Sequence, residues 1–127
     1  MDCIFCKITS GVIPTNFVAE SEHAVAFKDI SPRQPVHILV VPRKHFSDIA
    51  ELTDSDDNLL LELMKLARKV AAENTDGSFR LSFNTGSSAG QTVFHVHAHV
   101  TAKGAKAWWR RKVSVTLSWN LLLKASI

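Results

Sequence analysis

The sequence contains no hydrophobic run long enough to cross a membrane, and it has only two cysteines among 127 residues. A transmembrane helix needs about 20 consecutive apolar residues, and Met1-Asp2-Cys3 lacks the basic and apolar segments of a signal peptide. We therefore expect a cytoplasmic protein, with the nucleus as a second location, and no membrane among its partners. No repeat, linker or low-complexity tract is present, and the length fits one domain over residues 1–127.

Acidic residues are absent from the second part of the chain. Residues 77–127 hold seven lysines and arginines and no aspartate or glutamate, whereas residues 1–76 hold eight basic and twelve acidic residues. A positive region suits an anionic ligand. A solvated basic tail around Arg110-Arg111-Lys112 explains the same charge equally well.

The two cysteines, Cys3 and Cys6, form a Cys-x-x-Cys pair. In a reducing compartment such a pair is typical of metal binding or redox chemistry rather than of a structural disulfide. His45 and one histidine of the segment 95–99 would complete two thiolates and two imidazoles, which is a closed zinc site. The spacing matches no standard zinc finger, and buried thiols that pack as small hydrophobes are the alternative.

Three of the six histidines, His95, His97 and His99, stand at every second position. Successive side chains of a β-strand point to opposite faces, so a strand here would bring all three imidazoles to one face. Imidazole is a nucleophile and an acid–base catalyst near neutral pH. The preceding loop of small residues, 85–90, can bring its N–H groups close to a phosphate. The pattern indicates phosphoryl or nucleotidyl transfer.

The periodicity of apolar residues predicts an α+β domain with an antiparallel sheet backed by one long helix. Apolar residues recur at helical spacing from about residue 54 to 74, with Thr53 as the expected N-cap. The alternation in residues 79–84 predicts a strand that forms an antiparallel hairpin with the histidine segment. Further strands are expected at 18–20, 24–27 and 37–41.

Together these segments resemble the histidine triad (HIT) superfamily, and within it the Hint branch of histidine triad nucleotide-binding proteins. The matching stretches lie within about residues 2–100 and are 3–8, 26–30, 35–45 and 90–100. The resemblance implies a HIT-like α+β fold with a five-stranded antiparallel sheet, one long helix and a homodimer across which the sheet continues. It also implies an adenosine 5′-phosphoramidase-like hydrolase or transferase that acts on a purine nucleotide such as AMP.

The resemblance further implies roles for single residues. His97 matches the nucleophile that carries a transient nucleotidyl group, His99 the histidine that contacts the phosphate, and His95 the one that supports the nucleophile. Asp29 matches the carboxylate that holds the ribose hydroxyls, a role that its two acceptor oxygens suit. The residues that match the apolar walls around the base, which also suit a core, are Ile4, Phe5, Phe27 and Ile30. Those that match the groups around the phosphate and leaving group are Asn84, Gly90, Gln91 and Thr92, with Gln91 and His99 holding the charge.

In family members with the N-terminal cysteine pair, zinc is bound at positions that match Cys3, Cys6, His45 and His95. After His99 the resemblance fades, because the family's C-terminal Trp-Pro-Pro-Gly segment is missing from the divergent tail 101–127, where 113–117 alternate as an edge strand would. Two alternatives stay open: a dinucleoside polyphosphate hydrolase, and a module that binds nucleotide or zinc without turnover. We expect no nucleic acid as partner, and we interpret His23 and His37 as structural.

Overall fold

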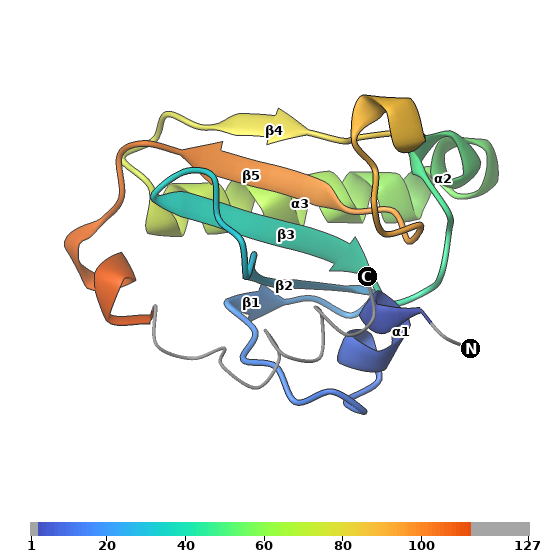
Figure 1. Ribbon diagram of the computed structural model, residues 1–127, viewed down its shortest axis with the longest axis horizontal. Helices are drawn as coiled ribbons and strands as arrows, with labels where there is room; N and C mark the ends of the chain where they lie inside the picture. The colour runs from blue at the N-terminus through green and yellow to red at the C-terminus, as the bar shows by residue number, and fades with distance from the viewer. Residues whose placement is uncertain (1–2, 113–127) are drawn as a thin grey trace.

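A five-stranded antiparallel sheet with helices on both faces forms the described part of the protein, residues 3–112 of a computed structural model (Figure 1). The strands, in the spatial order β1-β2-β3-β5-β4, are β1 (Ala19–Glu20), β2 (Ala24–Lys28), β3 (Val36–Pro42), β5 (Ala98–Ala102) and β4 (Arg80–Ser82). The α-helices are α1 (Ile4–Thr9), α2 (Ile49–Ser55) and α3 (Asp57–Asn74). The expected α+β class and five-stranded sheet are therefore confirmed. Within this part of the chain, no helix has the length and apolarity to cross a membrane.

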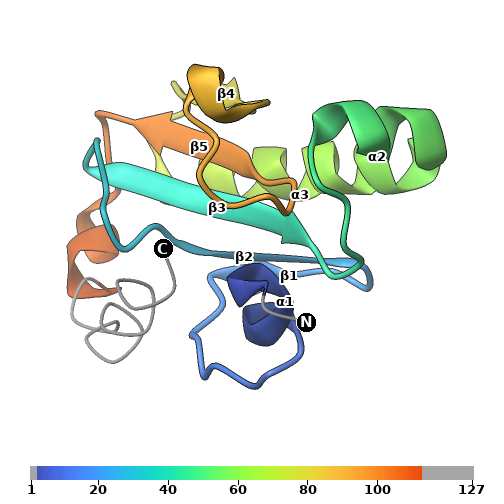
Figure 2. The ribbon, with the colours of Figure 1, turned by 45° about the vertical axis from the view of Figure 1, so that its right-hand side comes forward.

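The central strand β3 is buried along its whole length because helices cover both of its faces (Figure 2). Ile38 and Val40 pack in one apolar cluster with the leucines of α3. Leu39 and Val41 face the other way and pack with Phe5 of α1 in a second cluster. Since alternate side chains of a strand point to opposite faces, His37 lies on the α1 side of the sheet.

The long helix was predicted in the right region but with the wrong start. Instead of one helix from residue 54 with Thr53 as its N-cap, the chain forms α2, then a break at Asp56, then α3. Asp56 is extended, with φ −156° and ψ 93°, and its carboxylate accepts a hydrogen bond from the Leu59 N–H at 3.0 Å. A carboxylate at this position stabilises the free N–H groups and the positive end of a helix, so Asp56 starts a new helix.

The expectation of a strand through all three histidines was wrong, because β5 begins only at Ala98. Pro42 has no N–H to continue the β3–β5 ladder, and its carbonyl accepts from the His95 ring instead. The side-chain alternation persists nevertheless, since Val96 and Ala98 pack toward α3 while the histidines point away from it. The antiparallel pairing of β4 with β5 is confirmed, although β4 covers only Arg80–Ser82 rather than 79–84.

The N-terminal apolar stretch is a short helix, α1, which we did not predict from the sequence. Cys3 is its N-cap, and the Cys6 N–H donates to the Cys3 Sγ at 3.4 Å. The strands expected at 18–20, 24–27 and 37–41 are confirmed as β1, β2 and β3. The strand expected at 113–117 lies outside the described residues.

Candidate functional site

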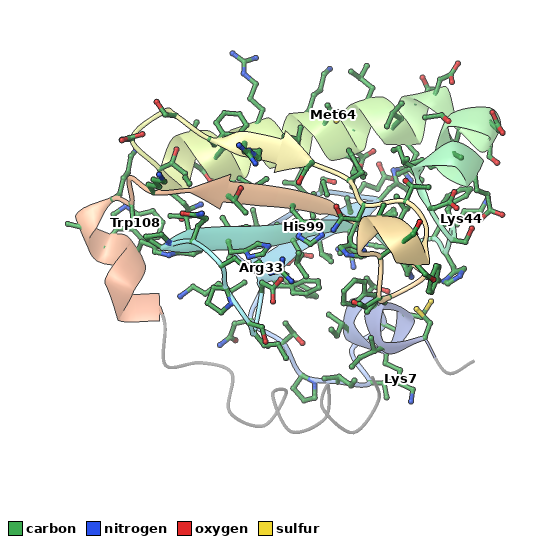
Figure 3. All side chains as sticks on the ribbon, turned by 45° about the horizontal axis from the view of Figure 1, so that its top comes forward. Lys7, Arg33, Lys44, Met64, His99 and Trp108 are labelled. Atoms are coloured by element: carbon green, nitrogen blue, oxygen red, sulfur yellow. The ribbon has the colours of Figure 1, made fainter. Side chains whose placement is uncertain are left out.

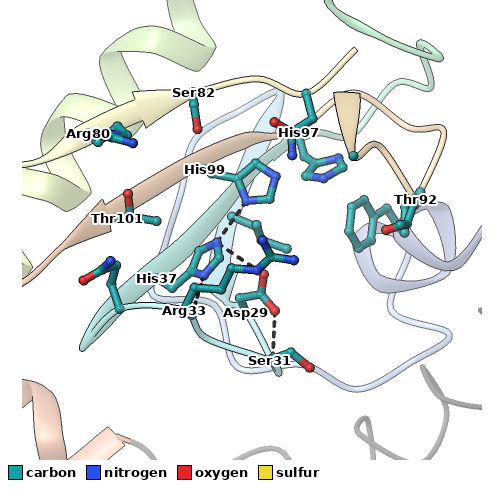
Figure 4. A pocket seen from close by; sticks show the side chains of 16 residues that line it. Asp29, Ser31, Arg33, His37, Arg80, Ser82, Thr92, His97, His99 and Thr101 are labelled. Carbon is teal, nitrogen blue, oxygen red and sulfur yellow. Dashed lines mark hydrogen bonds and ion pairs between the residues drawn. The ribbon is translucent and has the colours of Figure 1, made fainter. Parts of the chain in front are cut away.

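A pocket of about 440 Å³ opens on the α1 side of the sheet (Figure 4). The histidine segment, the β2–β3 loop and strand β4 contribute to its wall, and Figure 3 places His99 beside Arg33 near the middle of the molecule. Among the residues predicted to bind a nucleotide, those that line this pocket are Phe5, Asp29, Asn84, Gly90, Thr92, His97 and His99. The predicted base-wall residues Ile4, Phe27 and Ile30 belong to the apolar cluster around Phe5.

Gln91 is not part of the pocket wall. It is 3% exposed, and its Oε1 accepts from the Gly86 N–H at 2.9 Å. Its Nε2 donates to the carbonyls of Ser47 at 2.7 Å and Val93 at 3.1 Å. These contacts fix the small-residue loop, so Gln91 positions the loop rather than facing the pocket.

The ring of His97 is oriented so that its Nε2 is the unprotonated nitrogen. Its Nδ1 lies 2.8 Å from the His95 carbonyl, which can only accept a hydrogen bond, so Nδ1 carries the proton. Burial lowers the pKa of His97, and the side chain is 8% exposed. A neutral imidazole with a free Nε2 lone pair at the pocket wall is a competent nucleophile.

His37, interpreted from the sequence as structural, is the hydrogen-bond partner of His99. The Arg33 N–H donates to His37 Nδ1 at 3.2 Å, so the proton of the neutral ring is on Nε2. That Nε2 lies 2.9 Å from His99 Nδ1 and 3.3 Å from Asp29 Oδ2. His99 therefore accepts at Nδ1 and carries its own proton on Nε2.

The His99 Nε2–H is a donor available to a ligand. It is buried and has no hydrogen-bond partner among residues 3–112, and the rings of His97 and His99 have their centroids 4.8 Å apart. Burial, followed by the charges of His97 and His37, lowers the pKa of His99 to about 4. Near neutral pH the pocket thus offers an uncharged nucleophile beside an uncharged donor.

Four donor groups predicted to bind zinc converge at the N-terminus of α1. Their ligand atoms lie within 4.8 Å of one another and belong to Cys3, Cys6, His45 and His95. His95 Nδ1 lies 3.3 Å from Cys3 Sγ, 3.4 Å from Cys6 Sγ and 3.1 Å from His45 Nδ1. Ligands around a tetrahedral zinc ion stand about 3.3–3.8 Å apart, so the cluster has nearly the required spacing.

Two further observations fit a metal ion at this cluster. The His95 Nε2–H donates to the Pro42 carbonyl at 2.8 Å, which leaves Nδ1 as the nitrogen that faces the other three groups. Burial, followed by the Cys3 thiol, raises the pKa of Cys6 to about 11, so a cation is needed to keep the Cys6 sulfur as a thiolate. Asp29, His37 and His99 also lie within metal-binding distance of one another, but the hydrogen bonds given above account for their positions.

Sequence reasoning missed the partners of two histidines. His23 Nδ1 lies 2.9 Å from Glu62 Oε1 on α3, which links the β1–β2 turn to the helix. His37 pairs with Thr101 in the β3–β5 ladder. His99 stands two residues before Thr101, on the same face of the sheet, so the rings of His37 and His99 lie side by side. The alternation in 37–41 already placed His37 on the face of Leu39, but the strand register that brings His99 beside it cannot be deduced from the sequence.

Comparison with known proteins places this chain in a family. The family model described as scavenger mRNA decapping enzyme C-term binding matches residues 2–113. An uncharacterized HIT-like protein from Synechocystis is 41% identical over 108 residues, which cover 84% of this chain and 95% of that protein. A HIT family hydrolase from Legionella pneumophila, solved by crystallography, is 41% identical with a TM-score of 0.73, over 79% of this chain and 91% of its own. The chain belongs to the HIT family.

Two other solved relatives are named for what they bind. A hypothetical histidine triad nucleotide-binding protein from Sulfolobus tokodaii is 31% identical with a TM-score of 0.73, over 98% of this chain and 89% of its own. A Zn-bound histidine triad family protein from Mycobacterium smegmatis is 26% identical with a TM-score of 0.70, over 98% of this chain and 97% of its own. The resemblance to the family is confirmed by these comparisons, and the Hint branch within it stays a prediction.

Proposed function

We propose that the protein hydrolyses purine nucleoside 5′-phosphoramidates, or related monophosphate esters, through a nucleotide bound covalently to His97. The observation that carries this proposal is the Nδ1–H bond of His97 to the His95 carbonyl, because it leaves the Nε2 lone pair at the pocket wall. Relatives named as hydrolases and as a nucleotide-binding protein support its coarser part, a hydrolase that binds a nucleotide.

The reaction has two steps. His97 Nε2 attacks the α-phosphorus, a phosphorus–nitrogen bond forms, and the bond to the leaving amine breaks. Water then attacks the phosphorus, which releases AMP and the neutral ring of His97. The departing amine takes up a proton from solvent in the first step, and the attacking water returns one to solvent in the second. One water molecule is therefore consumed overall, its hydroxyl staying on the phosphorus and one proton on the amine. The His99 Nε2–H and the side chains of Asn84 and Thr92 face the pocket as donors for the phosphate oxygens.

The nucleoside would lie toward α1. Phe5 and Leu39 give this end of the pocket an apolar wall on which a base can pack. Asp29 projects from the adjacent β2–β3 loop, and its Oδ1 already accepts from the Ser31 N–H at 2.8 Å. Its remaining acceptor sites suit the ribose hydroxyls.

Zinc would be held by the cluster at α1, with Cys3, Cys6, His45 and His95 as its ligands. Two thiolates and two imidazoles close a tetrahedral shell, so the ion would supply structural support and no reactive position. The cluster adjoins the nucleophile, because His95 offers Nδ1 to the metal site and its carbonyl to the His97 ring. The Zn-bound relative from Mycobacterium smegmatis supports this proposal.

A homodimer with a continuous sheet would form through β4, one of the two outer strands of the sheet. Only its inner side pairs with a neighbour in the described part of the chain, which is β5. Phe79, which precedes β4, and Met64 on α3 are both exposed and offer apolar area. Sedimentation at micromolar concentration is expected to give twice the chain mass, and a monomer there would contradict this arrangement.

The experiment that tests the catalytic proposal is an assay of adenosine 5′-phosphoramidate hydrolysis. His97→Ala is expected to lower kcat at least about a thousandfold and to bind AMP within a few-fold of wild type. His23→Ala is the matched control, because it removes an exposed histidine outside the pocket. An inactive wild-type protein, or an active His97→Ala variant, would contradict the proposal.

A second candidate substrate class, dinucleoside polyphosphates, is favoured by two arginines of the pocket wall. Arg33, near Asp29 and His37, and Arg80 on β4 both line the pocket, and within residues 3–112 neither has an ion-pair partner. Two guanidinium groups suit a polyanionic leaving group better than a neutral amine.

The ratio of kcat/KM for diadenosine tetraphosphate to that for the phosphoramidate separates the two classes. If the polyphosphate is the better substrate, Arg33→Gln should lower this ratio at least about tenfold. Arg68→Gln on the exposed face of α3 removes the same charge and should leave the ratio unchanged. A ratio below one in wild type, or one unaffected by Arg33→Gln, would count against the polyphosphate class.

A further inference from the structure

The segment that follows β5 spans the end of the sheet and connects α3 with the β2–β3 loop (Figure 1). On the helix side, the Asp76 N–H donates to the Gly104 carbonyl at 2.9 Å, and the Lys106 N–H donates to the Asn74 carbonyl at 3.2 Å. The chain then enters the 3₁₀ helix η2 (Ala107–Lys112). This segment is therefore fixed to the end of α3 before it reaches the loop.

On the loop side, the contact is made by Trp109. Its side chain is 3% exposed, and its Nε1–H donates to the Pro35 carbonyl at 2.8 Å. Lys28 Nζ lies 4.5 Å from the centroid of the Trp109 ring, which is a cation–π distance. Lys28 ends β2 and Pro35 precedes β3, so a single indole contacts both ends of the loop.

The same loop ends carry two groups of the proposed nucleotide site. Asp29 follows Lys28, and His37 stands two residues after Pro35. The Asp29 N–H donates to the His37 carbonyl at 2.9 Å, which closes the base of the loop. A shift of the Pro35 carbonyl would move Asp29 and His37 relative to His97, which lies on another element.

We propose that Trp109 is a positioning residue that holds the β2–β3 loop, and with it Asp29 and His37, in the geometry that binds the ribose of a nucleotide. The assignment rests on the proposed function for its ligand, but the contact of Trp109 with the loop does not. Any buried indole N–H needs an acceptor, and within residues 3–112 that of Trp109 finds its acceptor in the Pro35 carbonyl, which ties the ring to the loop.

The first test measures the loop without any ligand. In Trp109→Phe the ring remains and the N–H donor is lost. Hydrogen exchange of the Ser31 and Arg33 amides, which report the Asp29 and His37 hydrogen bonds, should accelerate about fivefold, the factor expected for loss of one typical hydrogen bond. The amides of α3 serve as the internal control for global unfolding and should keep their rates.

Unchanged exchange at Ser31 and Arg33 would overturn the proposal, and so would acceleration that is uniform across α3. Trp108→Phe is the matched control, because it makes the same change in the neighbouring residue, which is only half-buried. We expect this control to leave the exchange of both loop amides at the wild-type rate.

The second test compares the binding of AMP with that of 2′,3′-dideoxy-AMP. Wild type should prefer AMP by about tenfold or more, since hydrogen bonds to a charged carboxylate are among the stronger ones. Trp109→Phe should reduce this preference about fivefold, while the affinity for the dideoxy compound stays within about twofold. An equal loss for both nucleotides would indicate general destabilisation and overturn the positioning role.

The two tests distinguish the proposed ribose contact of Asp29 from the proposed role of Trp109 in holding the loop. A wild-type protein that binds both nucleotides equally contradicts the ribose role of Asp29 under the proposed function. In that case the amide exchange of Ser31 and Arg33 still decides whether Trp109 holds the loop.

Discussion

At the scale of single residues, the pocket depends on which ring nitrogen of each histidine carries a proton. A backbone N–H donates to His37 Nδ1, and His37 Nε2–H in turn donates to His99 Nδ1. If His37 did not donate to His99 Nδ1, the proton of His99 could sit on Nδ1. His99 Nε2 would then be an unprotonated acceptor, which repels phosphate oxygens. His37 therefore acts on the proposed reaction through His99.

This order can be tested with two variants of His37. His37→Leu removes the donor and is expected to lower kcat/KM for the phosphoramidate about 10- to 100-fold, the cost of misplacing a catalytic group. His37→Gln places an amide N–H near the former Nε2 and should recover a large part of that loss. If the glutamine variant is no better than the leucine variant, the hydrogen bond to His99 does not control the site.

A pH dependence of stability follows from the low pKa of His99. Burial, followed by the charges of His97 and His37, lowers this pKa from 6.5 to about 4. Between these values the unfolded chain binds a proton that the folded protein does not, so stability falls as pH decreases from 6.5 to 4. The groups that face His99 are His37, Asp29, Arg33 and His97.

The measurement is urea denaturation of wild type and His99→Gln at pH values from 7 to 4. Both proteins keep the other histidines, so their shared titrations cancel in the difference. The wild type is expected to lose more stability than the variant across this range. Parallel curves would mean that His99 has an ordinary pKa in the folded protein.

At this scale the sequence indicated which side chains could act as nucleophiles, donors or metal ligands, because these abilities depend on residue type. His97 and His99 point to one side, as a two-residue repeat in extended chain requires, and the four predicted zinc ligands converge. The pairing of His37 with His99 was missed because it depends on strand register, which joins residues 62 positions apart. The side-chain contacts of Gln91 were missed because one of them is the Ser47 carbonyl, which lies 44 residues away in another loop.

At the scale of elements, the predicted strands and helix were right in kind and wrong at their ends. The leucine stripe identified α3, because apolar periodicity reflects burial against the sheet. Its start was predicted wrongly, with Thr53 as the N-cap, whereas α3 begins after Asp56, because local sequence alone does not settle where a helix begins. Helix α1 is six residues long, too short for periodicity to indicate it.

The predicted cap, Thr53, and the observed cap, Asp56, can be compared directly by mutation. Asp56 accepts from the Leu59 N–H at 3.0 Å, whereas Thr53 Oγ1 lies inside α2 and donates to the Ala50 carbonyl. Asp56→Ala is expected to cost about 0.5–2 kcal/mol of unfolding free energy. Thr53→Ala, a surface change, should stay within about 0.5 kcal/mol. Equal costs in urea denaturation would contradict the assignment of Asp56 as the cap.

At the scale of the whole molecule, the metal cluster brings together three segments that are far apart in the sequence. Cys3 and Cys6 belong to α1, His45 follows β3, and His95 precedes β5. The Cys6 Sγ lies 3.4 Å from both His45 Nδ1 and His95 Nδ1. A bound ion would thus fix α1 against the sheet next to His97, which directly precedes β5.

Removal of zinc is therefore expected to lower the stability of the whole protein and not only the order of α1. A ligand that binds the folded state at about 1,000 times its Kd adds about 4 kcal/mol, which corresponds to a Tm shift of about 10 °C or more for a domain of this size. Thermal unfolding of purified protein, with its metal content measured before and after a strong chelator, gives this shift directly.

Cys3→Ser separates metal loss from other effects of the chelator. The variant should contain less zinc, unfold at a lower temperature than wild type, and show no further shift with chelator. The wild-type Tm should return when zinc is added back, because the four ligands come from one folded chain and refolding restores their spacing. A wild-type protein purified without zinc, whose Tm is unaffected by added zinc or by chelator, would mean that the four side chains pack as thiols and imidazoles without a metal ion.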